Sequence, residues 1–229
     1  MSIFAIGDLH LAFGAPEKNM EVFGGRWQGY ADKIRRGFDL VREEDTVVIC
    51  GDFCWAMDLE SALPDFQFLH SLPGKKWMVK GNHDYWWTTA ARMTGFFREN
   101  GLDSIRLLHN NSVEREGLAL CGTRGWFYEE ETGTPHDEKI LRREVGRLER
   151  SLRSAGEGEK LAFLHYPPLY MNYACPPILE TLREHGVREC YYGHIHGSGC
   201  RAALQGERDG VIYRLISADY LDFFPYKVR

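Results

Sequence analysis

Residues 3–10, Ile-Phe-Ala-Ile-Gly-Asp-Leu-His, begin as a short apolar run and end in two side chains that can bind a metal ion. Residues 47–52, Val-Val-Ile-Cys-Gly-Asp, have the same form. Continuously apolar runs of this length are typical of strands that are covered on both faces. In α/β folds, functional side chains gather just beyond the carboxyl ends of such strands. These stretches therefore predict an α/β fold with a functional site at one edge of its sheets.

The same alternation of strand and helix patterns continues along the chain. The strand candidates are residues 2–7, 46–51, 76–80, 105–109, 118–122, 160–165, 189–193 and 211–217. Helical patterns lie between them at residues 30–42, 58–71, 86–100, 135–154 and 177–185. The longest has a clear start, with Thr134 as N-cap, Pro135 at the first helical position and Asp137 at capping-box spacing. No repeat, low-complexity tract or linker divides the sequence, so we expect a single domain over residues 1–229.

Composition narrows the classes of partner and the cellular location. The net charge of −5 offers no broad basic surface, which argues against nucleic acid and anionic membranes as partners. No apolar run approaches the roughly 20 residues of a membrane span. Removal of an N-terminal targeting segment would delete Asp8 and His10, so we expect a cytoplasmic protein whose six cysteines are reduced thiols.

Potential metal ligands occur in five short motifs, each directly after a strand candidate. The motifs are Asp8-Leu9-His10, Gly51-Asp52, Gly81-Asn82-His83-Asp84, His165, and Gly193-His194-Ile195-His196. Carboxylate, amide and imidazole donors in one set suit two first-row transition metals better than a calcium cage or a thiolate zinc site. The glycines allow the backbone to turn and approach the metals without a Cβ atom in the way. The spacing therefore predicts a dinuclear metal centre.

Together the motifs resemble those of the calcineurin-like metallophosphoesterase superfamily, over residues 8–196. The resemblance implies a four-layer α/β/β/α sandwich of the metallophosphoesterase type. It also implies that Asp8, His10 and His196 hold one metal ion and that Asn82, His165 and His194 hold the other, with Asp52 bridging the two. The metals would be two divalent ions of Mn, Fe, Zn or Ni, with Mn favoured.

The resemblance also implies catalytic roles for two neighbouring residues. His83 would face the substrate and protonate the leaving oxygen or stabilise charge in the transition state. Asp84 would orient His83 and stabilise its charge. Other branches of the superfamily fit less well, because protein Ser/Thr phosphatases carry an arginine shortly after the aspartate matching Asp52. The UDP-sugar hydrolases of lipid A synthesis typically carry arginine where His83 stands.

The expected activity is metal-dependent hydrolysis of phosphate esters through a metal-activated water or hydroxide, with phosphodiesters favoured over monoesters. The substrate would be a small phosphorylated compound, with a nucleotide as one option. Two alternatives stay open: a non-catalytic metal-binding scaffold of the same fold that serves protein interactions, and a nuclease of the same superfamily. The sequence gives neither the physiological substrate nor the oligomeric state.

Two further residues are candidates for substrate binding, each with a simpler alternative. Arg124 follows an apolar strand and could clamp a phosphate, or it could form a plain surface ion pair. Trp86 could stack on a nucleobase, although packing at the start of a helix is the favoured role. The long glycine-punctuated connection of residues 11–29 leaves from the metal end of the first strand, so we expect it to flank the substrate cleft.

Overall fold

The computed structural model describes residues 1–127, 134–171 and 173–229, and its two large sheets form the centre of the molecule. The first sheet has the order β13-β1-β2-β3-β4, with bounds β13 (Tyr226–Lys227), β1 (Ile3–Ile6), β2 (Thr46–Cys50), β3 (Lys75–Val79) and β4 (Ile105–Leu107). The second has the order β11-β12-β10-β7-β6-β5, with bounds β11 (Gly206–Arg208), β12 (Val211–Leu215), β10 (Val187–Tyr192), β7 (Glu159–Leu164), β6 (Leu118–Thr123) and β5 (Asn111–Arg115). The inner strands of both sheets are parallel, and β13, β11 and β5 pair antiparallel at the edges.

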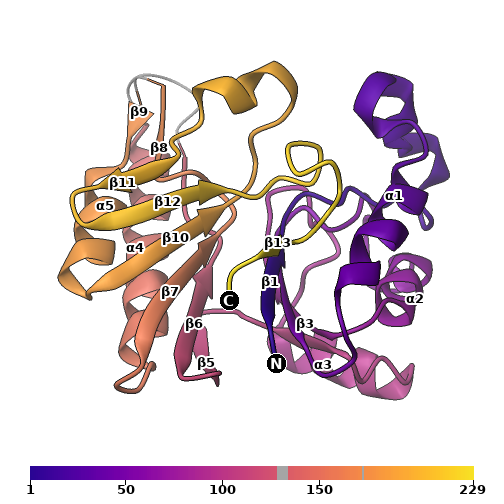
Figure 1. Cartoon of the computed structure of the whole chain (residues 1–229), viewed down its shortest axis with the longest axis horizontal. Helices are drawn as coiled ribbons and strands as arrows, with labels where there is room; N and C mark the ends of the chain where they lie inside the picture. Colours follow the sequence, from indigo (N-terminus) through magenta and orange to yellow (C-terminus); the bar gives the residue numbers. More distant parts are fainter. Residues whose placement is uncertain (128–133, 172) are drawn as a thin grey trace.

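Helices cover the outer face of each sheet (Figure 1). On the first sheet they are α1 (Tyr30–Gly37), α2 (Leu63–Ser71) and α3 (Ala90–Glu99), and on the second they are α4 (Pro135–Arg153) and α5 (Pro176–Glu184). A small hairpin of β8 (Leu169–Tyr170) and β9 (Tyr173–Ala174) lies beside the second sheet. The order helix, sheet, sheet, helix is the four-layer α/β/β/α sandwich implied by the sequence resemblance, and the fold prediction is confirmed.

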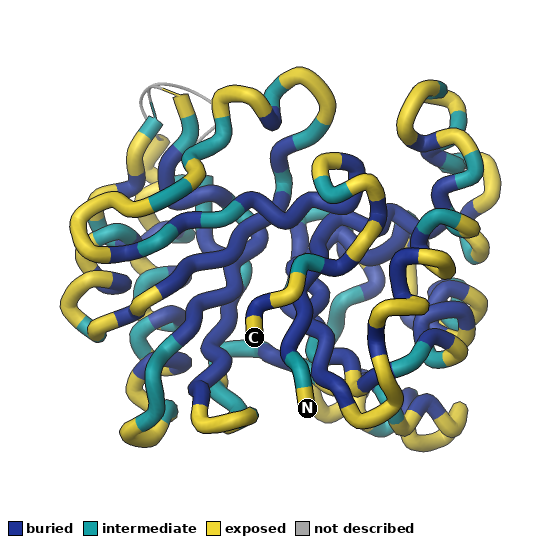
Figure 2. Tube along the Cα trace, viewed as in Figure 1, coloured by how far each residue is buried: buried dark blue, intermediate teal, exposed yellow. Residues whose placement is uncertain are grey.

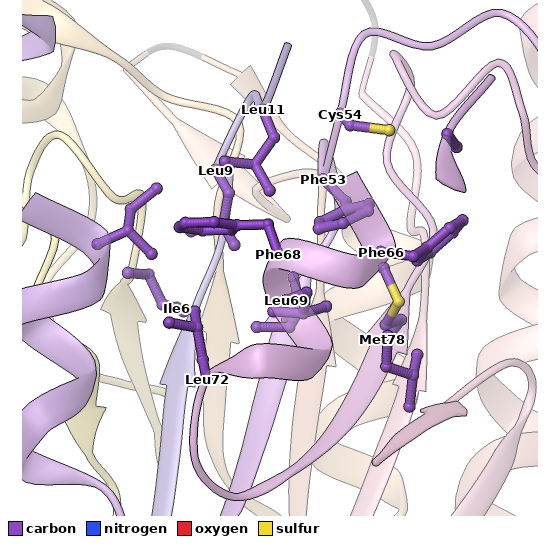
Figure 3. Packing of buried hydrophobic residues seen from close by; sticks show 14 of the residues in the cluster. Ile6, Leu9, Leu11, Phe53, Cys54, Phe66, Phe68, Leu69, Leu72 and Met78 are labelled. Carbon is purple, nitrogen blue, oxygen red and sulfur yellow. The ribbon is translucent and has the colours of Figure 1, made fainter. Parts of the chain in front are cut away.

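Three buried apolar clusters hold these layers together, and Figure 2 shows the buried chain running through both sheets. Between the sheets, Ile3 and Val48 of the first sheet share a cluster with Leu120 and Phe163 of the second. Under the first helical layer, Phe66 and Leu69 of α2 pack with strand residues such as Met78 (Figure 3). Because both faces of the central strands are covered, their sequences are apolar throughout and do not alternate.

The two sheets also meet through their backbones at one end. Gly7, just after β1, donates its N–H to the carbonyl of Ile216 at 2.8 Å, and Ala218 N–H donates to the carbonyl of Gly7 at 2.9 Å. These bonds form an isolated parallel bridge between Gly7 and Ser217. The carboxyl ends of β1 and β12 are therefore held together, and the ligand motifs lie at this edge.

The predicted strands and helices are present, with differences at their ends. Helix α3 begins at Ala90 and not at residue 86, because Thr89 caps it by accepting a bond from Arg92 N–H. The capping box of Thr134 and Asp137 is confirmed. All six cysteines are free thiols, as predicted, and all six are buried. Among the helices of the described ranges, none combines the length and apolar character needed to traverse a membrane.

The connection after β1 is more ordered than the sequence suggested. It contains three short 3-10 helices, Pro16–Lys18, Met20–Phe23 and Gly25–Trp27, before α1 begins. Asn19 caps the second by accepting a bond from Glu21 N–H, and Tyr30 donates its hydroxyl proton to the carbonyl of His10. These bonds hold residues 11–29 against the end of β1, next to the ligand motifs.

Candidate metal centre

Strand ends bring the seven predicted metal ligands to one edge of the molecule. Ligand atoms of Asp8, His10 and His196 lie within 4.8 Å of one another, and those of Asp52, His165 and His194 form a second such group. The oxygen Oδ1 of Asn82 lies 2.6 Å from Nε2 of His165, which adds Asn82 to the second group. The structure thus gathers the predicted ligands into two clusters, each with donors from both sheets.

The first cluster is organised by paired imidazoles. Nε2 of His10 lies 3.3 Å from Nε2 of His196, and the latter atom lies 3.8 Å from Oδ1 of Asp8. The other ring nitrogen of His196, Nδ1, lies 2.9 Å from Oδ1 of Asp219. A carboxylate can only accept, so Nδ1 carries a proton, and Nε2 is the nitrogen that can coordinate a metal ion once the ring is neutral.

In the second cluster, too, a hydrogen bond determines which ring nitrogen of a histidine is protonated. Nδ1 of His165 donates to the carbonyl of Cys50 at 3.1 Å, which leaves Nε2 as the potential ligand atom. Oδ2 of Asp52 lies 3.5 Å from that Nε2 and 3.8 Å from Nε2 of His10. The Asp52 carboxylate is therefore within reach of both clusters, which supports its assignment as the bridging ligand.

The backbone around these ligands is strained. Asp8, His10, Asp52 and His194 have φ angles of 59°, 46°, 48° and 71°, in the left-handed region that side chains other than glycine adopt infrequently. Such strain concentrates at functional sites, where the surrounding structure holds it. Glycines make the close approach possible: a Cβ atom on Gly81 would lie 2.1 Å from Oδ1 of Asp52, and one on Gly193 would lie 2.3 Å from Oδ2 of Asp8.

Burial sets the protonation of the ligands. It lowers the pKa values of His10, His165 and His194 to about 3, so these rings are neutral and able to coordinate. Burial alone would also lower the pKa of His196, but the hydrogen bond and charge of Asp219, together with Asp8, raise it to about 9. Burial raises the pKa of Asp8 to about 8. A buried carboxylate in this position needs nearby positive charge to be ionised at neutral pH.

His83 and Asp84 are placed by different partners than the sequence suggested. His83 is half-buried beside the first cluster, and its Nδ1 lies 3.1 Å from the hydroxyl of Tyr85. The buried Asp84 carboxylate instead accepts bonds from the backbone N–H groups of Gly81, Asp52 and Phe53 at 2.6, 3.1 and 2.8 Å. The expectation that Asp84 orients the His83 ring is therefore corrected: within the described residues, Asp84 joins the two ligand loops and Tyr85 is the partner of the ring.

With this geometry in view, comparison with protein families is decisive. The model of the calcineurin-like phosphoesterase family matches residues 1–198, most of the chain. The chain belongs to the calcineurin-like phosphoesterase family. No curated protein matches this phosphoesterase.

Solved structures agree on the fold. A protein of unknown function from Aquifex aeolicus, AQ665, is 17% identical with a TM-score of 0.55, covering 99% of this phosphoesterase and 95% of the other chain. A phosphopantetheinyl hydrolase from Mycobacterium tuberculosis is 14% identical with a TM-score of 0.61, with the same coverage of each chain. At such low identity these likenesses extend to the fold alone.

The residues of this phosphoesterase fit the divalent metal ions that its family implies. Both clusters combine carboxylate oxygens with imidazole nitrogens, a donor set that suits first-row transition ions. A cation bound between these side chains would lower the raised pKa of Asp8 and would take lone pairs from the facing Nε2 atoms of His10 and His196. The ligand set does not discriminate among the metals that prefer such donors.

The two candidate substrate residues of the phosphoesterase contact other side chains, and the backbone carbonyl of Arg124 accepts the N–H of His165 at 3.1 Å. The guanidinium of Arg124 lies 3.4 Å from the buried Glu144 and over the ring of Trp126, so it is already paired. Trp86 is 2% exposed and packs against Phe66 in the core. This placement favours the packing role of Trp86 over nucleobase stacking.

Sequence reasoning missed several residues of the site. Asp219 follows the strand candidate of residues 211–217, and this position of an acid after a strand end was the available signal. Trp27 and Trp55 line a cavity of about 600 Å³ beside the first cluster, together with His10, His83 and His196. The segment of residues 11–29 does flank this cavity, as expected, since Trp27 belongs to it. Trp55 carried no motif that would have marked it.

Proposed function

We propose that this chain hydrolyses small phosphate esters and prefers phosphodiesters to monoesters. The observation that carries the proposal is the position of Asp52 within reach of two ligand clusters, the first of which adjoins a cavity lined by His83. Two divalent ions, when bound there, would polarise the phosphoryl oxygens and activate the attacking water. Asp8, His10, Asp52, Asn82, His165, His194 and His196 would hold these ions.

His83 would act on the leaving group. Its Nδ1 is engaged with the Tyr85 hydroxyl at 3.1 Å, so Nε2 is the atom that would deliver a proton to the leaving oxygen. The ring packs against Trp55 with centroids 4.6 Å apart, which restricts its orientation. Asp84 would keep the loops of Asp52 and Asn82 at a fixed separation through its three backbone bonds.

The surroundings favour a diester. The cavity beside the clusters has room for the second organic substituent of a diester. A monoester carries more negative charge, which would call for further cations next to the metals. Among the described residues that line this cavity, Arg26 is the one arginine or lysine. Arg124 does not line it and is paired with Glu144.

Several expectations from the sequence remain part of this proposal. We place the enzyme in the cytoplasm, where its six free, buried cysteines would stay reduced. We treat residues 1–229 as one domain, because one apolar cluster is shared by the two sheets. Manganese is the favoured metal.

The test compares bis-p-nitrophenyl phosphate with p-nitrophenyl phosphate as substrates of metal-stripped protein re-supplied with Mn²⁺. We expect turnover of the diester to exceed that of the monoester and to vanish in Asp52→Asn. Preference for the monoester would overturn the diester assignment. Absence of turnover in protein that binds metal would favour a non-catalytic scaffold.

A second variant tests the role of His83. His83→Ala should lower kcat for the diester by about 100-fold or more while leaving metal content unchanged. The matched control is His185→Ala, which removes a histidine at the C-terminus of α5. An unchanged kcat in His83→Ala would refute the proton-transfer role.

A further inference from the structure

A second cavity adjoins the one beside the metal clusters. It has a volume of about 830 Å³ and shares Arg26, Gly197 and Ser198 with the first. The segments that line the pair come from distant parts of the sequence, the indigo turns after β1 and the orange turn after β10 in Figure 1. The two cavities are therefore neighbours, and we refer to them together as the groove, whose nearer half adjoins His10 and His196 of the first cluster.

The half of the groove next to the clusters is aromatic and apolar. Met20, Phe23, Trp27 and Trp55 line it. The ring of Trp55 stacks on His10 with centroids 4.8 Å apart and planes 22° apart, and Trp27 lies 5.8 Å from the ring of His196. A planar or apolar group attached to the scissile phosphate would lie against these rings.

The far half of the groove is cationic. Arg26 and Arg201 line it together with the polar side chains of Ser198 and Gln205, and its described lining contains no Asp or Glu. Within the described ranges, no ion pair joins Arg26 or Arg201 to a carboxylate. Arg26 Nη1 donates to the carbonyl of Asp219 at 2.7 Å, which fixes this side chain between the two cavities. An anionic group would find two guanidinium groups here with unused donors.

We propose that the substrate is a phosphate ester whose organic group has a planar or apolar face beside the scissile phosphate and carries a second anionic group farther out. The rings of Trp27 and Trp55 contact the face, and Arg26 and Arg201 bind the second anion. This assignment rests on the proposed phosphoesterase function and narrows its substrate class. A nucleotide with two separate phosphate groups is one compound of this class.

The test uses three probes that differ by one feature at a time: inorganic phosphate, adenosine 5′-monophosphate and adenosine 3′,5′-bisphosphate. Each competes with bis-p-nitrophenyl phosphate on Mn²⁺-loaded protein, and quenching of tryptophan fluorescence reports binding directly. We expect the inhibition constant to fall about tenfold with the ring and about tenfold again with the second phosphate.

Variants test which half of the groove provides each increase in affinity. Arg201→Gln should raise the inhibition constant of the bisphosphate about tenfold and leave that of the monophosphate unchanged. Phe23→Ala should weaken both nucleotides about threefold and leave inorganic phosphate unchanged. Arg142→Gln is the matched control, because Arg142 is an exposed arginine on α4 that lines neither cavity.

The outcomes separate this inference from the proposed function. If the bisphosphate binds no tighter than the monophosphate, or if Arg201→Gln behaves as Arg142→Gln, the cationic half is refuted. If the monophosphate binds no tighter than inorganic phosphate, the aromatic half is refuted. If no ester is hydrolysed but fluorescence still gives the expected order of affinities, the groove assignment stands and the phosphoesterase function fails.

Discussion

His196 donates its Nδ1–H to Oδ1 of Asp219 at 2.9 Å, while Oδ2 of the same carboxylate accepts the N–H of Gly197 at 2.9 Å. Asp219 is 1% exposed and lies after β12, whereas His196 lies after β10. The carboxylate therefore fixes both the tautomer of His196 and the loop that carries it. Partners of this kind are worth about 10- to 100-fold in metal affinity.

Asp219→Asn tests this relationship. The amide keeps the size of the side chain but loses the charge that favours the required tautomer. We expect metal affinity to fall about 10- to 100-fold, measured by titration of metal-stripped protein with Mn²⁺. The control is Asp209→Asn, because Asp209 has an exposed carboxyl group in the turn between β11 and β12. Equal affinities in the two variants would show that Asp219 has no such role.

Gly81 and Gly146 form a matched pair of glycine sites. A Cβ atom at Gly81 would lie 2.1 Å from both N and Oδ1 of Asp52, whereas one at Gly146 in α4 would meet no atom within 4 Å. Gly81→Ala should lower the free energy of unfolding by about 2 kcal/mol and weaken metal binding, because Asp52 must move. Gly146→Ala should raise the free energy of unfolding by about 1 kcal/mol. Urea denaturation checks both, and a neutral Gly81→Ala would contradict the close approach.

Trp86 provides a test of packing against substrate stacking. Its ring packs at 4.9 Å from the ring of Phe66 and is 2% exposed. Trp86→Phe should lower the free energy of unfolding by about 1–2 kcal/mol and leave KM for the diester unchanged. Steady-state kinetics well below the melting temperature make the measurement. A large rise in KM without loss of stability would restore the stacking role.

Lys76 links stability to pH. Its side chain is fully buried, and its Nζ donates to the carbonyl of Leu72 after α2 and lies 3.4 Å from Oγ of Ser104. Burial lowers the pKa of Lys76 from 10.5 to about 8, so between these pH values the unfolded chain binds more protons than the folded one. Stability contributed by this group therefore rises as the pH increases from about 8 to 10.5.

Lys76→Met should remove that rise. Other groups titrate over the same range, so the informative quantity is the difference in free energy of unfolding between wild type and variant at each pH. We expect the difference to shift in favour of the wild type as the pH increases from 8 to 10.5. A difference that stays constant over this range would contradict the lowered pKa.

The sequence predicted that the candidate ligands lie together because each one follows a buried strand, and backbone geometry carries such residues to a common edge. Asp8, Asp52 and His194 each lie two residues beyond the last strand residue, at a left-handed backbone position that the sequence pattern does not specify. The edge strand β13 was not predicted, because it pairs with β1 at the other end of the chain. Strand β11 pairs with the adjacent β12, but its sequence Gly-Glu-Arg is polar and mostly exposed, so it shows no apolar strand pattern. Residues that act through contacts across the fold, such as Asp219 and Trp27, leave little local signal.

Each ligand cluster takes side chains from both sheets: Asp8 and His10 meet His196, and Asp52 meets His165 and His194. Neither sheet alone contains a complete set of donors, and the Gly7–Ser217 bridge fixes the alignment of the two at this edge. Bound ions would thus cross-link the halves of the sandwich. Any sliding of one half against the other would alter both ion sites at once, so the capacity to hold metal depends on the alignment of the entire molecule.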